Sequence, residues 1–254
     1  MIAKKDEEMA ALREGGKRLG EILRTLADHA TPGVSTLVLE DEARRMIAEG
    51  GDTAAFLGYK PAGSKRPYPA ALCVSINDAI VHGIPNEGSY IIQDGDVVTV
   101  DLGLVHKGHI TDAAITVIAG TGNPEDVKLV SATRDALAAG IAEARVGNTL
   151  GDVGAAIEAV GNRYKLGSPR DLGGHSVGKK VHEEPFIPNF GKRGEGVKIV
   201  EGMVLAIEPM LTRGSSEIKL DPDGYTYRTK DGSRAAHSEH TILVTATGPE
   251  VLTA

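Results

Sequence analysis

The sequence predicts an α+β protein built from two similar halves. In each half, segments with helical spacing of apolar side chains come first and β-branched runs follow, an order that favours α+β over alternating βαβ units. The two breaks between paired helices also look alike, Pro-Gly-Val-Ser-Thr-Leu at 32–37 and Arg-Val-Gly-Asn-Thr-Leu at 145–150. No Pro/Gly/Ser-rich linker divides the chain. We therefore expect one domain over residues 1–254, with halves of about 1–120 and 121–254.

Two helices are expected at the start of the first half. Apolar residues recur at near-helical spacing over residues 6 to about 30, and the sequence Thr-Pro-Gly at 31–33 ends this helix. Ser35 and Thr36 offer an N-cap for a second helix, which the glycines at 50–51 end. Residues 52–70 are rich in Gly and Pro and are expected to be irregular.

Residues 97–117 form two β-branched runs around a Lys107-Gly108 turn signal, which predicts a hairpin. Each run carries one acid, Asp101 and Asp112, within otherwise apolar strand sequence. Burying an unpaired carboxylate is costly, and two acids roughly opposite each other on paired strands repel. Either one face of the hairpin is wet, or the two acids are half of a metal site.

The second half repeats this order and supplies more acids. Helices are expected over 125–144 and from residue 150 onward. Glu208 ends one apolar strand, Glu239 begins another, and His175 lies in a glycine-rich loop-and-strand stretch. Four carboxylates and one imidazole converging from both halves are hard to explain without cations. Oxygen-rich ligation with one histidine suits two divalent ions about 3.5–4 Å apart.

Residues 174–178, Gly-His-Ser-Val-Gly, match the Gly-x-Ser-x-Gly pattern of serine hydrolases. That pattern has a physical meaning only between a buried strand and a following helix. The preceding residues 165–171 do not resemble a buried strand, and Pro185 and Pro188 leave no room for a helix afterwards. The sequence therefore disfavours a serine nucleophile here.

Composition narrows the class of partner. The net charge of −7 argues against nucleic acid, because a phosphate footprint needs clustered Lys and Arg. The single cysteine, Cys73, excludes an intrachain disulfide and fits a reducing compartment. The charged N-terminal segment has no apolar signal region, and no run approaches the roughly 18 apolar residues of a membrane span. We expect a cytoplasmic protein with no membrane partner.

Several motifs, in their order along the chain, resemble those of the methionine aminopeptidases. They are His-Gly-Ile-Pro at 82–85, Val-Asp-Leu-Gly at 100–103, Gly-His at 174–175, His-Glu-Glu-Pro at 182–185, Ile-Glu-Pro at 207–209 and Glu-His-Thr at 239–241. The resemblance covers nearly the whole chain and implies the pita-bread fold, with two pseudo-symmetric α-β halves around a central antiparallel sheet. The short interval between His182 and Glu208 excludes the helical insertion of the type II enzymes, so the chain resembles type I.

The resemblance implies a hydrolase that removes the initiator methionine from nascent chains when the next residue is small. It implies two divalent ions (Co, Mn, Fe or Zn), with Asp112 and Glu239 as bridging ligands. Glu208 would also act as general base, His182 would stabilise the developing oxyanion, and His82 would position the scissile amide. The full ligand set would be Asp101, Asp112, His175, Glu208 and Glu239, and the methionine pocket would draw on Tyr59, Tyr68, Cys73 and Tyr225. Cys73 could equally be a small core residue.

The chain departs from the family pattern near the expected pocket. Val81, Ala113, Val181 and Tyr225 stand where Cys, Thr or Ser, an aromatic residue and Trp are usual, and residues 62–66 resemble an insertion. None of these changes removes a metal ligand, so they bear on substrate range and leave the hydrolytic chemistry intact.

Two alternatives remain open. An X-Pro aminopeptidase or dipeptidase of the same fold would use the same ligands, although those enzymes usually carry a large extra N-terminal domain. A metal-free binding protein of this fold would be expected to have lost ligands. The expected partners are nascent polypeptide N-termini, with the ribosome exit region as a further candidate, and the expected oligomeric state is a monomer.

Overall fold

The computed structural model describes residues 1–254 and confirms the α+β class. The four helices are α1 (Asp6–His29), α2 (Thr36–Glu49), α3 (Pro124–Glu143) and α4 (Leu150–Tyr164). The strands are β1 (Thr53–Ala54), β2 (Leu72–Ile76), β3 (Ala79–Val81), β4 (Val97–His106), β5 (His109–Ile118), β6 (Gly173–Ser176), β7 (Glu183–Pro188), β8 (Val204–Ile207), β9 (Met210–Thr212), β10 (Ile218–Leu220), β11 (Tyr227–Thr229), β12 (Ala235–His237), β13 (Glu239–Thr245) and β14 (Gly248–Val251).

Helices α2 and α4 begin with side chains that bond backbone N–H groups, and the cap of α2 is the predicted Ser35. Ser35 Oγ accepts a hydrogen bond from the backbone N–H of Val38 at the start of α2. At the start of α4, the carboxylate of Asp152 accepts one from the backbone N–H of Thr149 at 2.8 Å. These bonds satisfy N–H groups that have no partner within the helix. None of the four helices is both long and apolar enough to cross a membrane.

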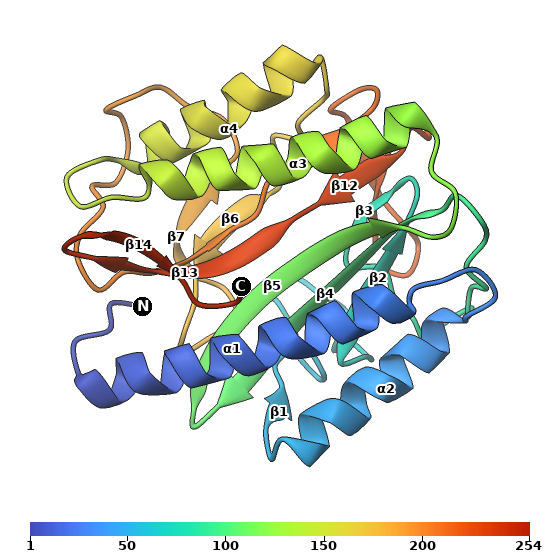
Figure 1. Ribbon diagram of the computed structural model, residues 1–254, viewed down its shortest axis with the longest axis horizontal. Coiled ribbons are helices and arrows are strands. Elements are labelled where there is room, and N and C mark those ends of the chain that lie inside the picture. Colours follow the sequence, from blue (N-terminus) through green and yellow to red (C-terminus); the bar gives the residue numbers. More distant parts are fainter.

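One antiparallel sheet of nine strands forms the centre of the molecule. Its order is β1-β4-β5-β13-β8-β6-β7, with β2 also paired to β4 and β14 to β13. The first half of the chain meets the second where β5 pairs with β13, through Ala114 opposite Glu239 and Ala113 opposite His240. The pair α1 and α2 belongs to the first half and the pair α3 and α4 to the second, as Figure 1 shows. This arrangement confirms the two-halved fold that the motifs imply.

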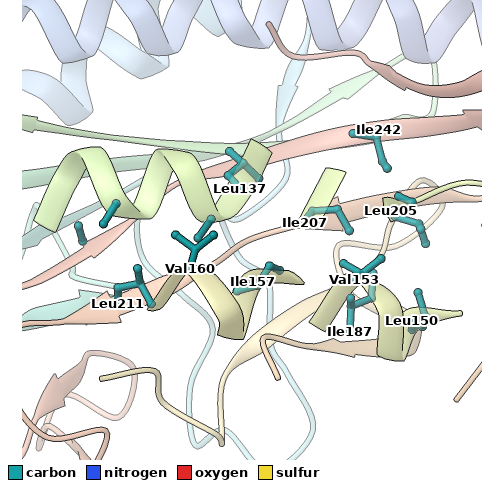
Figure 2. Packing of buried hydrophobic residues seen from close by; sticks show 14 of the residues in the cluster. Leu137, Leu150, Val153, Ile157, Val160, Ile187, Leu205, Ile207, Leu211 and Ile242 are labelled. Atoms are coloured by element: carbon teal, nitrogen blue, oxygen red, sulfur yellow. The ribbon is translucent and has the colours of Figure 1, made fainter. Parts of the chain in front are cut away.

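Side chains alternate between the two faces of the sheet, and one face packs against the helices. The even-numbered residues of β4 from Val98 to Leu104 are buried in an apolar cluster with Leu19, Leu23 and Leu39 of the first two helices. In the second half, Leu205 and Ile207 of β8 pack with Leu137, Ile157 and other residues of α3 and α4 (Figure 2). The intervening residues of these strands point to the opposite face, which carries the acids.

Candidate metal centre

The two acids of the hairpin lie on the same face of neighbouring strands. Asp101 pairs with Ala114 and Asp112 pairs with Gly103, so the two acids are diagonal neighbours rather than directly opposite each other. Both are buried, with 6% and 3% of their surface exposed. The wet-face interpretation is therefore wrong for this hairpin, and two carboxyl groups share a buried environment.

The second half brings two more carboxyl groups and an imidazole to the same place. Glu239 begins β13 beside β5, while Glu208 directly follows β8. His175 in β6 pairs with Ala206 of β8, and its Nε2 lies 3.4 Å from Glu208 Oε1. Ligand atoms of Asp112, His175 and Glu239 lie within 4.8 Å of one another. The five predicted ligands thus gather where the two halves of the sheet join.

The electrostatics of this cluster are those of acids that cannot all ionise without a cation. Burial raises the pKa of Asp112 to about 7. Burial and then the charge of Asp112 raise the pKa of Asp101 well above its usual range. Burial, and then the charges of Asp112 and Asp101, also raise the pKa values of Glu208 and Glu239 well above their usual range. Burial lowers the pKa of His175 to about 3, so its ring is neutral and able to act as a ligand.

The residues fit divalent metal ions. Asp101 Oδ1, Asp112 Oδ1 and Glu239 Oε1 are buried and have no hydrogen-bond partner in the protein. Leaving a buried polar atom unpaired costs about 1–3 kcal/mol, and more for a charged group. Several such oxygens aimed at one place indicate a cation, and mixed carboxylate and imidazole ligands suit Mn, Fe, Co or Zn.

Two further histidines lie beside the acids. The rings of His175 and His182 meet edge to face with centroids 4.5 Å apart, and Tyr59 Oη lies 2.9 Å from His182 Nδ1. Burial lowers the pKa of His182. His82 has a positive φ of 60° and its carbonyl oxygen accepts a hydrogen bond from Thr226 Oγ1. Burial, and then the neighbouring His182, lower the pKa of His82 to about 4.

A cavity of about 760 Å³ connects these groups to the predicted methionine pocket. Its lining includes all four pocket residues, Tyr59, Tyr68, Cys73 and Tyr225. The rings of Tyr68 and Tyr225 meet edge to face at 5.1 Å, and the Tyr68 hydroxyl donates to the carbonyl oxygen of Gly83 at 2.9 Å. Cys73 pairs with Asp101 across β2 and β4, and also packs in an apolar cluster with both rings. Cys73 is therefore both a buried core residue and part of the cavity wall, so the two expectations for it hold together.

Residues 62–66, expected to be an insertion, lie in a loop beside this cavity that leaves the chain at Tyr59 and returns at Tyr68; we call this loop the excursion. The backbone N–H of Tyr68 donates to the carbonyl oxygen of Tyr59 at 2.8 Å, which brings the ends of the excursion together. Arg66 makes two hydrogen bonds to Glu87, of 2.5 and 2.6 Å, and a third to the carbonyl oxygen of Asp223. The Tyr225 hydroxyl donates to the carbonyl oxygen of Arg66. Arg66 thus joins three loops that carry pocket residues.

The structure shows where the unusual residues around the site lie, and what surrounds Asp112 and Ser176. Val81 and Val181 line the cavity, whereas Ala113 faces the apolar cluster under the first two helices. Thr241 holds the backbone of Asp112 on both sides. Its Oγ1 accepts a hydrogen bond from the Asp112 N–H at 2.8 Å and donates one to the Asp112 carbonyl oxygen at 2.7 Å. Ser176 is buried and its hydroxyl donates to the carbonyl oxygen of Val204, so the structure agrees that it is no exposed nucleophile.

The sequence reasoning missed one titratable residue of the site. His237 is 1% exposed and its Nε2 lies 3.4 Å from Glu208 Oε2. Burial, and then the nearby His82 and His175, lower the pKa of His237 to about 3. It stands two residues before Glu239, and this spacing on an extended chain is the signal that could have found it. Phe56 and Met210 also line the cavity and were not predicted.

Comparison with known proteins identifies the family. A sequence model described as metallopeptidase family M24 matches residues 10–246. The chain belongs to this family. The match spans every predicted ligand, from Asp101 in β4 to Glu239 in β13, and membership of a metallopeptidase family implies that the protein uses divalent metal.

Individual relatives of this M24 chain are methionine aminopeptidases. It is 46% identical to a methionine aminopeptidase of Aquifex aeolicus, over 97% of this chain and 96% of that protein. It is 44% identical to methionine aminopeptidase 1 of Mycobacterium tuberculosis, over 97% and 92%. The crystal structure of the methionine aminopeptidase from Thermotoga maritima matches with a TM-score of 0.94 at 38% identity, over 100% and 99% of the two chains.

A more distant solved structure shares the fold alone. The prolidase from Pyrococcus furiosus matches with a TM-score of 0.77 at 20% identity, and this chain covers 65% of that one. The X-Pro enzymes that the sequence left as an alternative are therefore represented here only by a distant relative.

Proposed function

We propose that the protein is a metal-dependent methionine aminopeptidase that removes the initiator methionine from nascent chains when the second residue is small. The observation that carries the proposal is the convergence of four buried carboxyl groups and His175 on a cavity whose other wall holds three tyrosines. The identity of 37–46% to curated methionine aminopeptidases over nearly the full chain supports the same conclusion.

We assign the metal ligands to Asp101, Asp112, His175, Glu208 and Glu239, which would together hold the divalent metal, and the resemblance implies that Asp112 and Glu239 would be shared between two ions. When bound, such ions acidify a water molecule and polarise the carbonyl that it attacks. Co, Mn, Fe and Zn all suit this donor set, and availability in the cell contributes to the choice. Thr241 Oγ1 bonds both the N–H and the carbonyl oxygen of Asp112, so it would hold the backbone of this ligand in place.

The remaining polar groups have separate roles in peptide hydrolysis. Glu208 accepts the proton of the attacking water and later passes it to the leaving amine. The Tyr59 hydroxyl beside His182 Nδ1 favours the tautomer with the proton on Nε2, so His182 donates a hydrogen bond to the developing oxyanion. His82, buried and neutral on a backbone held by Thr226, positions the scissile amide.

The methionine side chain occupies the cavity between Tyr59, Tyr68, Cys73 and Tyr225. Aromatic faces and a thiol suit a polarizable thioether. Tyr225 is anchored by its hydroxyl to Arg66, so the smaller ring at this position is held in place by the neighbouring excursion. The pocket therefore remains defined although the chain departs from the usual residues here.

We further propose that residues 1–254 form a single catalytic domain, that the protein acts in the cytoplasm on nascent chains, and that it is a monomer. The one cysteine is free and buried, which fits a reducing compartment. Contact with the ribosome exit region remains a prediction from the substrate class.

The test is a competition assay on metal-stripped protein reloaded with Mn or Co. Met-Ala-Ser and an Ala-Pro peptide compete in one tube, and mass spectrometry identifies the products. Release of methionine that depends on added metal is the expected result. Cleavage only before proline would move the protein to the X-Pro alternative. No cleavage despite bound metal would favour a binding protein.

A further inference from the structure

His237 is the one imidazole of the site to which the expected mechanism gives no role. It ends β12, directly opposite Met210 of β9, and is 1% exposed. Its backbone N–H donates to Thr116 Oγ1 at 3.0 Å, and Thr116 Oγ1 donates to its carbonyl oxygen. One residue of β5 therefore holds the backbone of His237 on both sides, and the ring is directed into the cluster of acids.

Neither ring nitrogen of His237 has a hydrogen-bond partner. Its Nε2 lies 3.4 Å from Glu208 Oε2 and 3.8 Å from Glu239 Oε2. Hydrogen bonds of this type are about 2.7–3.2 Å long, so both distances are too long for one. Two ligand atoms each about 2.1 Å from a tetrahedral ion lie about 3.4 Å apart. The spacing therefore fits two ligands of one ion better than a donor and its acceptor.

The two imidazoles of the cluster take corresponding places around Glu208. His175 Nε2 lies 3.4 Å from Oε1 of that carboxyl group, and His237 Nε2 lies 3.4 Å from Oε2. Ligand atoms of Glu208, His237 and Glu239 lie within 4.8 Å of one another, as do those of Asp112, His175 and Glu239. The two groups of three share Glu239, the arrangement expected when one carboxylate bridges two ions.

We propose that His237 is a sixth protein ligand, which donates Nε2 to an ion that it shares with Glu208 and Glu239. His237 would give this position an imidazole ligand, which makes it softer than a position built of oxygen ligands alone. Imidazole suits Zn, Fe and Co, whereas carboxylate and water suit Mn and Mg. His237 thus biases one of the two positions toward Co, Fe or Zn and against Mn. The inference rests on the two-ion site of the proposed function, but not on its preference for methionine.

The test is metal binding measured apart from catalysis. Metal-free wild-type protein, His237→Gln and His237→Ala are titrated separately with Co(II) and Mn(II) in a calorimeter, and the visible absorption of the Co(II) forms is recorded. His240→Gln is the matched control, because His240 lies only three residues further along the chain, in β13, and its Nδ1 is 2.8 Å from Thr253 Oγ1, away from the acids. Gln keeps a polar side chain of similar size, and circular dichroism checks that each variant folds.

Removing His237 is expected to weaken binding of one Co(II) equivalent by about tenfold or more and to change its absorption spectrum, with less than about threefold change for Mn(II). His240→Gln is expected to match the wild type. Wild-type Co(II) affinity and spectrum in both His237 variants would overturn the proposal, as would equal weakening for the two metals. If the wild type shows the expected Co(II) binding but releases no methionine, the methionine specificity fails and the ligand assignment stands.

Discussion

The two faces of the nine-stranded sheet are made of the same strands but carry opposite chemistry. On the helix-covered face, Val100 and Leu102 of β4 and Ile207 of β8 are fully buried against apolar neighbours. On the cavity face, Asp101 lies between the first two of these residues in sequence, and its Oδ1 is buried with no partner. One residue along the chain separates a side chain that stabilises the fold from one that destabilises it until a cation binds.

This difference shows how the fold tolerates a strongly unfavourable site. The two largest apolar clusters pack on one face against the two helix pairs, and none of the acids belongs to them. The site also lies where β5 meets β13, at the junction of the two halves, so each half supplies part of the ligand set. We therefore expect substitutions on the two faces to separate activity from stability.

The largest expected effect is the loss of activity when a cavity-face acid is removed. Asp101→Asn should lower kcat/KM for Met-Ala-Ser by about a thousandfold or more, because it removes a proposed metal ligand. Metal-free Asp101→Asn should unfold at the same temperature as the metal-free wild type or at a higher one, since a buried acid that repels Asp112 has gone. Steady-state kinetics and thermal melting check this pair of results. Unchanged turnover would rule out the assigned role of Asp101.

The corresponding change on the helix-covered face should have the opposite pattern. Ile157 of α4 is fully buried among apolar side chains (Figure 2). Its side chain also lies close to Gly140 of α3. Ile157→Ala should lower the free energy of unfolding by about 2–5 kcal/mol and leave kcat/KM of the folded protein nearly unchanged. Urea denaturation gives the stability. Val127→Ala on the exposed side of α3 is the control and should change it by less than about 0.5 kcal/mol. A large loss of activity in Ile157→Ala would show that the two faces are coupled.

Metal removal should make stability depend on pH through the cavity-face acids. The folded-state pKa of Asp112 is raised to about 7, so its contribution to stability is complete below the unfolded value near 4 and is lost as the pH rises through about 7. Asp101, Glu208 and Glu239 act in the same direction. The metal-free protein should therefore melt about 5 °C or more lower at about pH 8 than at about pH 5, and added Mn should restore stability at the higher pH. A melting temperature that does not change with pH, or the same pH dependence in Asp112→Asn, would contradict this.

The smallest expected effect concerns the loops around the cavity. Arg66 is partly exposed, so its ion pair with Glu87 should add little to stability, yet it joins three loops that carry pocket residues. Arg66→Ala should raise KM for Met-Ala-Ser by roughly tenfold with kcat nearly unchanged, and Arg66→Lys, which keeps a positive charge and a hydrogen-bond donor, should raise it less. Arg13→Ala removes a similarly exposed pair with Glu250 far along the chain and is the control. An unchanged KM in Arg66→Ala would show that the excursion does not shape the pocket.

The sequence predicted those parts of the fold that depend on local pattern. The four helices and the hairpin with its turn at Lys107 and Gly108 followed from periodicity and capping residues. The five ligands could be found because an acid in an apolar strand conflicts with its surroundings. The short strands β9 to β12 were missed, since three residues are too few to show a period.

What the sequence could not give was the relation between segments far apart in the chain. Nothing local to Asp101 and Asp112 sets the register that makes them diagonal neighbours, and nothing local to Arg66 pairs it with Glu87 and Asp223. His237 was missed because a lone histidine in a strand is usually ordinary. Its place two residues before Glu239 was the one local signal, and its distance to Glu208 depends on segments far apart in the chain. The assignment of residues 1–254 to a single domain remains a prediction, which one cooperative unfolding transition would support.

The central claim is that the cavity face holds two divalent ions among its buried acids. A crystal of the protein soaked in Co(II), with an anomalous difference map calculated at the cobalt edge, tests this directly. We predict two cobalt peaks about 3.5–4 Å apart, bridged by Asp112 and Glu239. A single peak would contradict the claim that this face holds two ions. Peaks that do not contact Asp101, Asp112 and Glu239 would contradict the assignment of these acids as ligands.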